Sequence, residues 1–198
     1  MTIPLSLDAT RAAVLSMDLQ NGIVANYLKG QEDFLGRAGG VLKEARGRGL
    51  SVIHIQVGFR PGLPEVSVRN SLFGAIKNSA QHQRLFQGTS GEIHSAVAPE
   101  GDDIVITKHR VSAFAGTDLD MILRAKDIET LVLFGVVTSG VVLSTLLHAS
   151  DADYRLVVVK DCCADSDAEV HSCLIEKVFP RRASVVEASE FLGALKAS

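Results

Sequence analysis

The residues best placed to do chemistry follow apolar runs of the chain. Asp18 comes directly after residues 12–17, and Lys108 comes directly after residues 103–107. If both runs are strands of one parallel sheet, a carboxyl and an ammonium group stand at the edge where ligands bind in open α/β sheets. A carboxyl group at such an edge is suited to proton transfer. Taken alone, the spacing slightly favours simpler roles, a cap for Asp18 and a solvated surface charge for Lys108.

The segment 130–149 is the one around which the chain is organised. Residues 131–134 read LVLF, the continuous apolar run typical of a strand covered on both faces. Glycines at 135 and 140 interrupt this run, and apolar residues then return at mixed helical spacing. We therefore expect a buried strand, a tight turn and a buried helix, with the turn at the ligand-binding edge.

These segments together resemble the isochorismatase-like family, the cysteine hydrolases. The family motifs are D-x-Q-N, K-x-x-x-S-A-F and G-x-x-T-x-x-C-V. This chain reads DLQN from Asp18, KHRVSAF from Lys108 and GVVTSGVV from Gly135. The resemblance covers residues 12–186, and it departs at the nucleophile, where Val141 stands in place of the cysteine. A valine side chain can neither ionise nor attack a carbonyl group.

The resemblance implies roles for particular residues. In the family an aspartate, here Asp18, deprotonates the thiol, and a lysine, here Lys108, supports the charge while the thiolate attacks an amide. It further implies a cis peptide bond between Val136 and Val137, with the amides of Val137 and Val141 forming an oxyanion hole. Without the thiol, amidase chemistry by this route should be negligible. The residues expected to contact the substrate are Gln20, Phe59, Phe114, Val137 and Thr138.

One function open to such a chain is hydrolysis without a covalent intermediate. In isochorismatase proper, the resemblance implies, an aspartate protonates a vinyl ether and water completes the cleavage. Asp18 would then be the general acid, which requires apolar surroundings that raise its pKa. Lys108 would oppose this by favouring the carboxylate, and the sequence does not show which effect is larger.

Two other functions remain open. An amidase could recruit another nucleophile, with Cys162 or Cys163 the first candidates and Ser139 or Ser144 weaker ones that lack a base. Alternatively, the chain is catalytically silent and binds a small ligand or serves as an oligomeric scaffold, because a fold alone does not establish an activity.

Apolar runs and helical patterns alternate along the chain. The expected strands are 12–17, 51–57, 103–107, 131–134, 155–160 and 183–186. The expected helices are 32–48, 71–77, 117–126, 141–149, 166–179 and 189–196, while residues 20–22, Gln-Asn-Gly, predict a turn. This alternation predicts one α/β domain over residues 1–198, a three-layer α/β/α sandwich with a six-stranded parallel sheet. The resemblance implies the Rossmann-like strand order 3-2-1-4-5-6.

The polar segment 60–102 is long for a connection inside a compact domain. It carries three prolines and several glycines, and such segments are usually functional loops or lids. We expect it to cover the pocket, where it would decide substrate identity, or to build a subunit contact.

Composition limits the partners of the chain. Its 198 residues are 46% hydrophobic and 22% charged, with a net charge of −3 and no long run of Lys or Arg, so we expect neither a nucleic-acid nor a membrane partner. The sequence shows no signal peptide, and its three cysteines form no disulfide framework, so we expect a cytoplasmic protein.

The expected partners are a small-molecule substrate and further copies of the chain. Some members of the family carry a metal site, Asp-x-His, just beyond the second strand, where this chain has residues 58–62, GFRPG. We therefore expect no metal and no other cofactor. Because members of the family usually assemble, we expect a homo-oligomer, a dimer or a tetramer.

Overall fold

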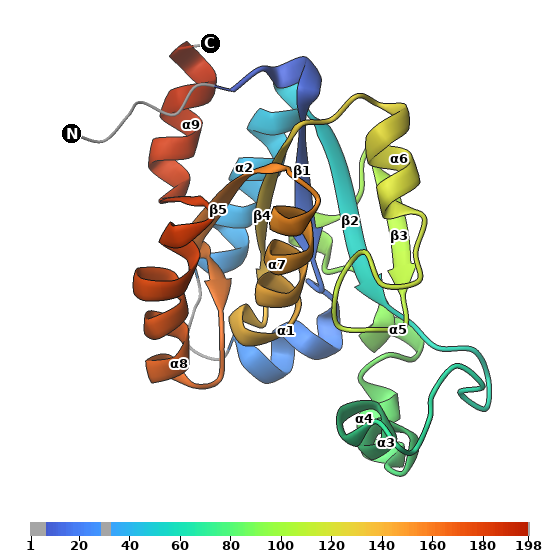
Figure 1. Ribbon diagram of the computed structural model, residues 1–198. Coiled ribbons are helices and arrows are strands. Elements are labelled where there is room, and N and C mark those ends of the chain that lie inside the picture. The colour runs from blue at the N-terminus through green and yellow to red at the C-terminus, as the bar shows by residue number, and fades with distance from the viewer. Residues whose placement is uncertain (1–6, 29–32, 198) are drawn as a thin grey trace.

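A six-stranded parallel sheet forms the centre of the computed structural model, which describes residues 7–28 and 33–197. Its order, β3-β2-β1-β4-β5-β6, confirms the predicted topology (Figure 1). The strands are β1 (Ala12–Met17), β2 (Ser51–Val57), β3 (Ile104–Lys108), β4 (Thr130–Val136), β5 (Arg155–Ala164) and β6 (Ser184–Val186).

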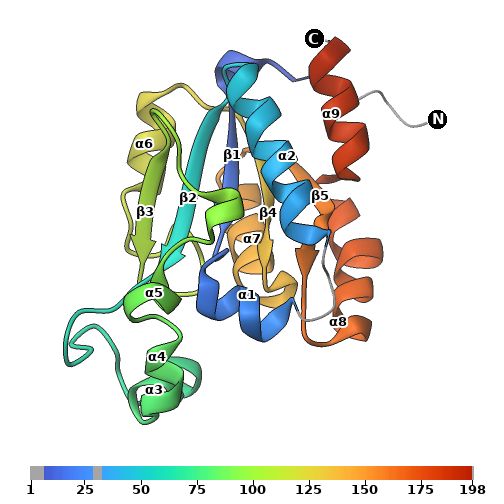
Figure 2. The ribbon, with the colours of Figure 1, turned by 180° about the vertical axis from the view of Figure 1, so that it is seen from behind.

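Helices cover both faces of the sheet, which gives the predicted three layers. On one face lie α2 (Phe34–Gly47) and α9 (Ala188–Ala197), and on the other lie α6 (Leu119–Ala125) and α7 (Leu143–Asp151) (Figures 1 and 2). The two pairs of helices lie on opposite faces because right-handed crossovers change side where the strand order reverses, between β1 and β4. The shorter helices are α1 (Asn21–Tyr27), α3 (Ser71–Lys77), α4 (Ala80–Arg84), α5 (Gly88–Gly91) and α8 (Ala168–Cys173), with 3-10 turns at Ala9–Arg11, Ser95–Val97 and Phe179–Arg181 and π turns at Thr138–Val142 and Leu174–Val178.

The core explains why the central strands are uniformly apolar. Every residue of β1 and of β4 is buried, because helices cover both faces of these inner strands. Each fully buried Val, Leu or Phe side chain contributes about 1.5–3 kcal/mol relative to an exposed one. This core holds the carboxyl ends of β1 and β4 side by side, with Met17 paired to Gly135.

Two local predictions were wrong. Residues 20–22 form no turn. Instead, Gln20 stands at the N-cap position of helix α1, where its backbone carbonyl accepts a hydrogen bond from the amide of Val24, and residue Ile23 of this helix packs into the core. Strand β5 continues past residue 160 to Ala164, because its last residues pair with the end of β4 and are buried there. The two adjacent cysteines therefore lie within a central strand and not in the loop after it.

The segment 60–102 holds several short helices, of which 71–77 was predicted. Helix α3 begins where the side chain of Asn70 accepts a hydrogen bond from the amide of Phe73. In Figure 1, α3 and α4 project from the body beyond the carboxyl ends of β2 and β3. The predicted helix 32–48 starts at Phe34, and residue 32 lies outside the described part of the chain. None of the described helices is both long and apolar enough to cross a membrane.

Candidate active site

Asp18 and Lys108 form a buried ion pair. The Nζ of Lys108 lies 2.9 Å from Oδ2 of Asp18, and the two side chains are 2% and 8% exposed, respectively. The ammonium group also donates to the carbonyl oxygen of Arg110 at 3.1 Å. The other carboxylate oxygen, Oδ1 of Asp18, is buried and has no hydrogen-bond partner among the described residues. One oxygen is therefore held by the lysine, and the other is buried without a hydrogen bond from any described residue.

The sheet places both residues at its carboxyl edge. Asp18 follows the last residue of β1, its backbone amide donates to Ile55 of β2, and its φ of 58° turns the chain away from the sheet. Lys108 is the last residue of β3, paired with Val57 of β2. The pair thus spans β2, which lies between the strands that carry it. The interpretation of Lys108 as a solvated surface charge was wrong.

The turn after β4 supplies the third part of the site. Gly135 adopts a φ of 145°, and a Cβ there would collide with the backbone carbonyl of Met17, so only glycine fits. The peptide bond between Val136 and Val137 is cis, as the resemblance implies. Val141 follows within the π turn, with its side chain buried. The predicted turn therefore lies beside the ion pair.

An apolar cavity joins these parts. Its volume is about 350 Å³, and its lining includes Asp18, Lys108, Val137 and Val141. The projecting segment supplies much of the opposite wall, including Leu72, Phe73, Ile76, Leu85 and Phe86. We call this space the inner cavity. The segment 60–102 was predicted to cover the pocket or to build a subunit contact, and part of this segment does line the inner cavity.

Burial dominates the electrostatics of the pair. Loss of solvent raises the pKa of Asp18 above its ordinary value, and the nearby charge of Lys108 offsets this only in part. Asp18 therefore holds a proton more readily than a solvated aspartate does. The apolar side chain of Val141 adds to this desolvation, because both residues line the inner cavity.

Arg110 brings a further positive charge to the inner cavity. Its guanidinium group donates to the carbonyl oxygens of His109 at 2.6 Å and Glu65 at 2.9 Å and lies 5.5 Å from the centre of the Phe73 ring. These contacts hold the guanidinium group in place. Because a guanidinium has five N–H donors, others remain that could bind a ligand. Asp18 is the sole acidic residue among the described residues that line this cavity.

Four of the five predicted substrate contacts lie elsewhere. Gln20 has a structural role. Its side-chain nitrogen donates to the carbonyl oxygens of Val57 and Gly91, and its side-chain oxygen accepts from the backbone amide of Val57. Phe59 packs against other aromatic rings and does not line the inner cavity. Phe114 stacks on a histidine ring 4.4 Å away, and Thr138 is buried with its hydroxyl 2.8 Å from Nδ1 of His171. Val137 is the one of the five that lines the cavity.

The alternative nucleophiles are also poorly placed. Cys162 and Cys163 are buried in β5, and neither is among the described residues that line the inner cavity. Burial raises the pKa of both thiols, that of Cys163 to about 12, so neither is a thiolate near neutral pH. The hydroxyl of Ser144 donates back to the carbonyl of Gly140, and Ser139 holds Asp165 through its backbone amide.

Sequence reasoning missed several residues that line the inner cavity. Arg110 lies two residues beyond Lys108 in the same motif, and this position was the sequence signal that could have identified it as a lining residue. Tyr27 and Ile23 were missed because helix α1 was expected to be a turn. Among the described residues, no three His, Cys, Asp or Glu side chains are grouped so that they could hold a metal ion.

Known proteins resemble this chain in sequence and in architecture. The family model described as Isochorismatase domain matches residues 12–190. Isochorismatase family protein YecD of Escherichia coli O157:H7 is 31% identical over 196 residues, which cover 96% of this chain and 100% of that protein. Ureidoacrylate amidohydrolase RutB of Methylorubrum extorquens is 31% identical over 177 residues, covering 80% and 71%. The solved structure of an isochorismatase family protein from Burkholderia thailandensis matches with a TM-score of 0.83 at 28% identity, covering 98% and 100%.

Proposed function

Because the chain belongs to the isochorismatase family, we propose that it is a hydrolase of a small organic molecule that works without a covalent intermediate and uses Asp18 as its general acid. The observation that carries this proposal is the environment of Asp18. One oxygen is bound by Lys108, and the other is buried without a partner in a carboxyl group that lines the inner cavity. Val141 supplies no attacking atom at the turn.

The proposed reaction is the cleavage of a vinyl ether. Protonated Asp18 gives its proton to the terminal vinyl carbon, and the carbon bound to oxygen becomes an oxocarbenium ion. Water adds to that carbon and returns a proton to the carboxylate, and the resulting hemiketal collapses to a ketone and an alcohol. Each proton that leaves Asp18 is replaced, so the cycle needs no further reagent.

Lys108 has a matching role in this scheme. Its ammonium group stabilises the carboxylate that forms when Asp18 donates its proton, which helps the transfer. The same attraction lowers the pKa of Asp18, but burial is the larger effect, so the acid form stays accessible. The pair thus combines a proton donor with a fixed charge that supports its conjugate base.

Arg110 supports a carboxylate-bearing substrate. Lys108 and Arg110 place two cations at a cavity with a single acidic side chain among its described lining residues. When Asp18 is protonated, both charges face an otherwise apolar space, which favours an anionic ligand. A carboxylate at Arg110 would leave the reacting group of a small substrate near Asp18.

A two-step experiment tests the proposal. A thermal-shift screen of vinyl ether carboxylates, such as isochorismate, and of small primary amides finds the ligands that bind. Each ligand is then tested for turnover with the wild type and with Asp18→Asn, which keeps the shape of the side chain but removes the proton. We expect vinyl ether cleavage that falls by roughly 10²–10⁴-fold in the variant, the usual contribution of a general acid.

Two outcomes would contradict the proposal. Binding without turnover by the wild type would favour the catalytically silent alternative, a ligand-binding or scaffold protein. Rapid hydrolysis of an amide such as nicotinamide would show that this turn supports acyl transfer without a cysteine.

A further inference from the structure

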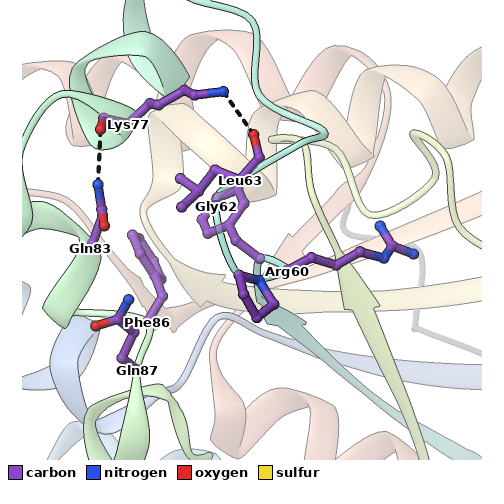
Figure 3. Close-up of a pocket in the computed structure, with 9 residues that line it drawn as sticks. Arg60, Gly62, Leu63, Lys77, Gln83, Phe86 and Gln87 are labelled. Atoms are coloured by element: carbon purple, nitrogen blue, oxygen red, sulfur yellow. Dashed lines mark hydrogen bonds between the residues drawn. The ribbon is translucent and has the colours of Figure 1, made fainter.

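A second cavity lies beside the inner one. Its volume is about 460 Å³, and it opens between the chain after β2, residues 59–63, and the segment that carries α3 and α4 (Figure 3). We call this space the outer cavity. Phe86 lines both cavities, while Asp18, Lys108 and Val141 line only the inner one. The proposed function makes no use of the outer cavity.

Aromatic and aliphatic side chains form its walls. The rings of Phe59 and Phe86 meet edge to face with centroids 5.5 Å apart. In Figure 3 the ring of Phe86 faces the chain at Gly62 and Leu63 across the cavity. A flat ring placed there would bury apolar area and meet an aromatic neighbour, which is worth about 0.5–1.5 kcal/mol beyond burial. The walls therefore favour a planar ligand.

Two amides stand beside these walls. The amide nitrogen of Gln83 donates to the carbonyl oxygens of Ile76 and Lys77 at 3.3 and 2.9 Å, which fixes that side chain, and no described residue donates a hydrogen bond to its oxygen. Gln87 is exposed, and no hydrogen bond joins its side chain to another described residue. Its amide can therefore donate to a ligand in the cavity.

The charged residues that line the outer cavity, Lys77 and Arg60, are both positive. Lys77 is fixed by hydrogen bonds of 3.0 Å to the carbonyls of Leu63 and Val66 and has no carboxylate partner among the described residues. Arg60, at the rim, is 66% exposed, and its guanidinium group lies 3.9 Å from Oε1 of Glu65, which also accepts a hydrogen bond from the backbone amide of Arg60 at 2.8 Å. None of the described residues that line the cavity is acidic. Such a balance attracts anions.

From these features we propose that the outer cavity is a second binding site, for planar organic anions such as aromatic carboxylates. The ring packs on Phe86 and Phe59, and the carboxylate lies toward the amide of Gln87, in a cavity whose charged lining residues are both cations. Because Phe86 also lines the inner cavity, a ligand here would contact a wall of the candidate active site. Binding in the outer cavity does not require turnover in the inner one.

Methyl NMR can locate the ligand directly. Leu63 lines only the outer cavity and Val141 only the inner one, so their methyl signals report on each space separately. The probe is 2-naphthoate, with 2-naphthamide as its uncharged counterpart. We expect 2-naphthoate to shift the Leu63 methyl signals saturably while the Val141 signals stay in place, and to bind more tightly than the amide.

A pair of matched variants tests the role of charge. Gln87→Glu puts a carboxylate beside the proposed ligand, and we expect it to weaken naphthoate binding by roughly tenfold through like-charge repulsion. Gln81→Glu makes the same change on α4 at an exposed residue that lines neither cavity, and we expect no change in affinity. Both sites are exposed, so both variants should fold.

Three results would overturn the inference. The first is a shift of the Val141 methyls without the Leu63 methyls, which would place the ligand in the inner cavity. The second is the absence of a saturable shift at Leu63. The third is the loss of the preference for an anion. It would be seen either as equal weakening of 2-naphthoate binding by the two glutamate variants or as equal affinity of the protein for 2-naphthoate and 2-naphthamide.

Discussion

At the scale of single residues, the replacement of a thiol by Val141 can be reversed. Val141→Cys puts a sulfur beside Asp18 and Lys108, the two groups that in the family deprotonate the thiol and support its charge. We expect the new thiol to react with iodoacetamide faster than Cys162 and Cys163, which are buried and have raised pKa values. We also expect the variant to gain hydrolysis of small amides, measured by ammonia release.

The matched control is Val141→Ala, which enlarges the inner cavity without adding a nucleophile. If the alanine variant gained the same amidase activity, the effect would be one of space and not of the thiol. Cys173 is exposed and would be alkylated in every variant, so the modified residue is identified by peptide mass spectrometry. If the thiol at position 141 were not alkylated and the variant were inactive, the turn would not present this position to a substrate.

The residues of the site were predictable to different degrees. Asp18, Lys108, Val137 and Val141 gather at one cavity, because strand ends and a turn give their positions. Gln20 shares the motif of Asp18, but its side chain closes hydrogen bonds with β2 and α5, which no local pattern reveals. For these residues the sequence placed the strand ends and the turn, but it did not show in which direction each side chain points.

At the scale of elements, the turn after β4 depends on Gly135. Gly135→Ala would require a φ of 145° for a side chain and would push its Cβ into the carbonyl of Met17. We expect a loss of about 1–3 kcal/mol in unfolding free energy. Urea unfolding followed by circular dichroism measures it.

Gly193→Ala in α9 is the matched control. A Cβ there meets no other atom within 4 Å, and alanine stabilises a helix interior by roughly 0.5–1 kcal/mol relative to glycine. Equal effects at the two positions would mean that the conformation of Gly135 is not required.

A buried network between β2, α2 and β3 predicts how stability depends on pH. His54 is buried, with Nε2 3.0 Å from Oδ2 of Asp103, and the Asp103 carboxylate accepts three hydrogen bonds from Arg46, at 2.6, 3.0 and 3.3 Å. Burial lowers the pKa of His54 below its ordinary value of 6.5, so the unfolded chain binds this proton more readily than the folded chain. Stability is therefore expected to fall as pH drops through about 6.5.

Urea unfolding at a series of pH values measures this slope. His54→Gln keeps an N–H donor for Asp103 but does not titrate, so it should flatten the dependence near that pH. Asp103 does not interfere there, because Arg46 and the neighbouring hydrogen bonds hold its pKa below the ordinary value, and its contribution is lost only at lower pH. An unchanged slope in the variant would show that His54 is not the titrating group.

The element predictions failed where tertiary contacts override local signals. Gln-Asn-Gly is typical turn chemistry, yet these residues open helix α1, because the Gln20 side chain is satisfied by its neighbours. Strand β5 continues beyond the polar residues Lys160 and Asp161, because the last residues of β5 pair with the end of β4. The inner strands β1 and β4 were predictable because burial on both faces leaves continuous apolar runs, whereas the edge strands β3 and β6 are partly exposed.

At the scale of the whole molecule, the number of subunits stays a prediction. We expect a dimer or a tetramer, and apolar side chains are exposed on the surface, with Leu72 at 56% and Met121 at 67%. Size-exclusion chromatography with light scattering gives the mass of the particle. A monomer at micromolar concentration would contradict the expectation.

The architecture was predictable from the order of the elements, but the projecting segment was not. Its length suggested a lid, whereas the division of its side chains between two cavities depends on how α3 and α4 pack beyond the sheet edge. The separate apolar cluster of Leu63, Val66 and Phe73 gives this segment its own small core. Such packing joins residues that have no regular spacing in the sequence.

The central claim is that burial keeps Asp18 available as an acid despite the adjacent Lys108. A ¹³C NMR titration of the Asp18 carboxyl carbon, assigned by its loss in Asp18→Asn, measures this directly. We expect a midpoint above the ordinary value of 3.8, and a still higher one in Lys108→Met, where the offsetting charge is gone. A midpoint at or below that value in the wild type would mean that the ion pair dominates, and Asp18 would then be no general acid.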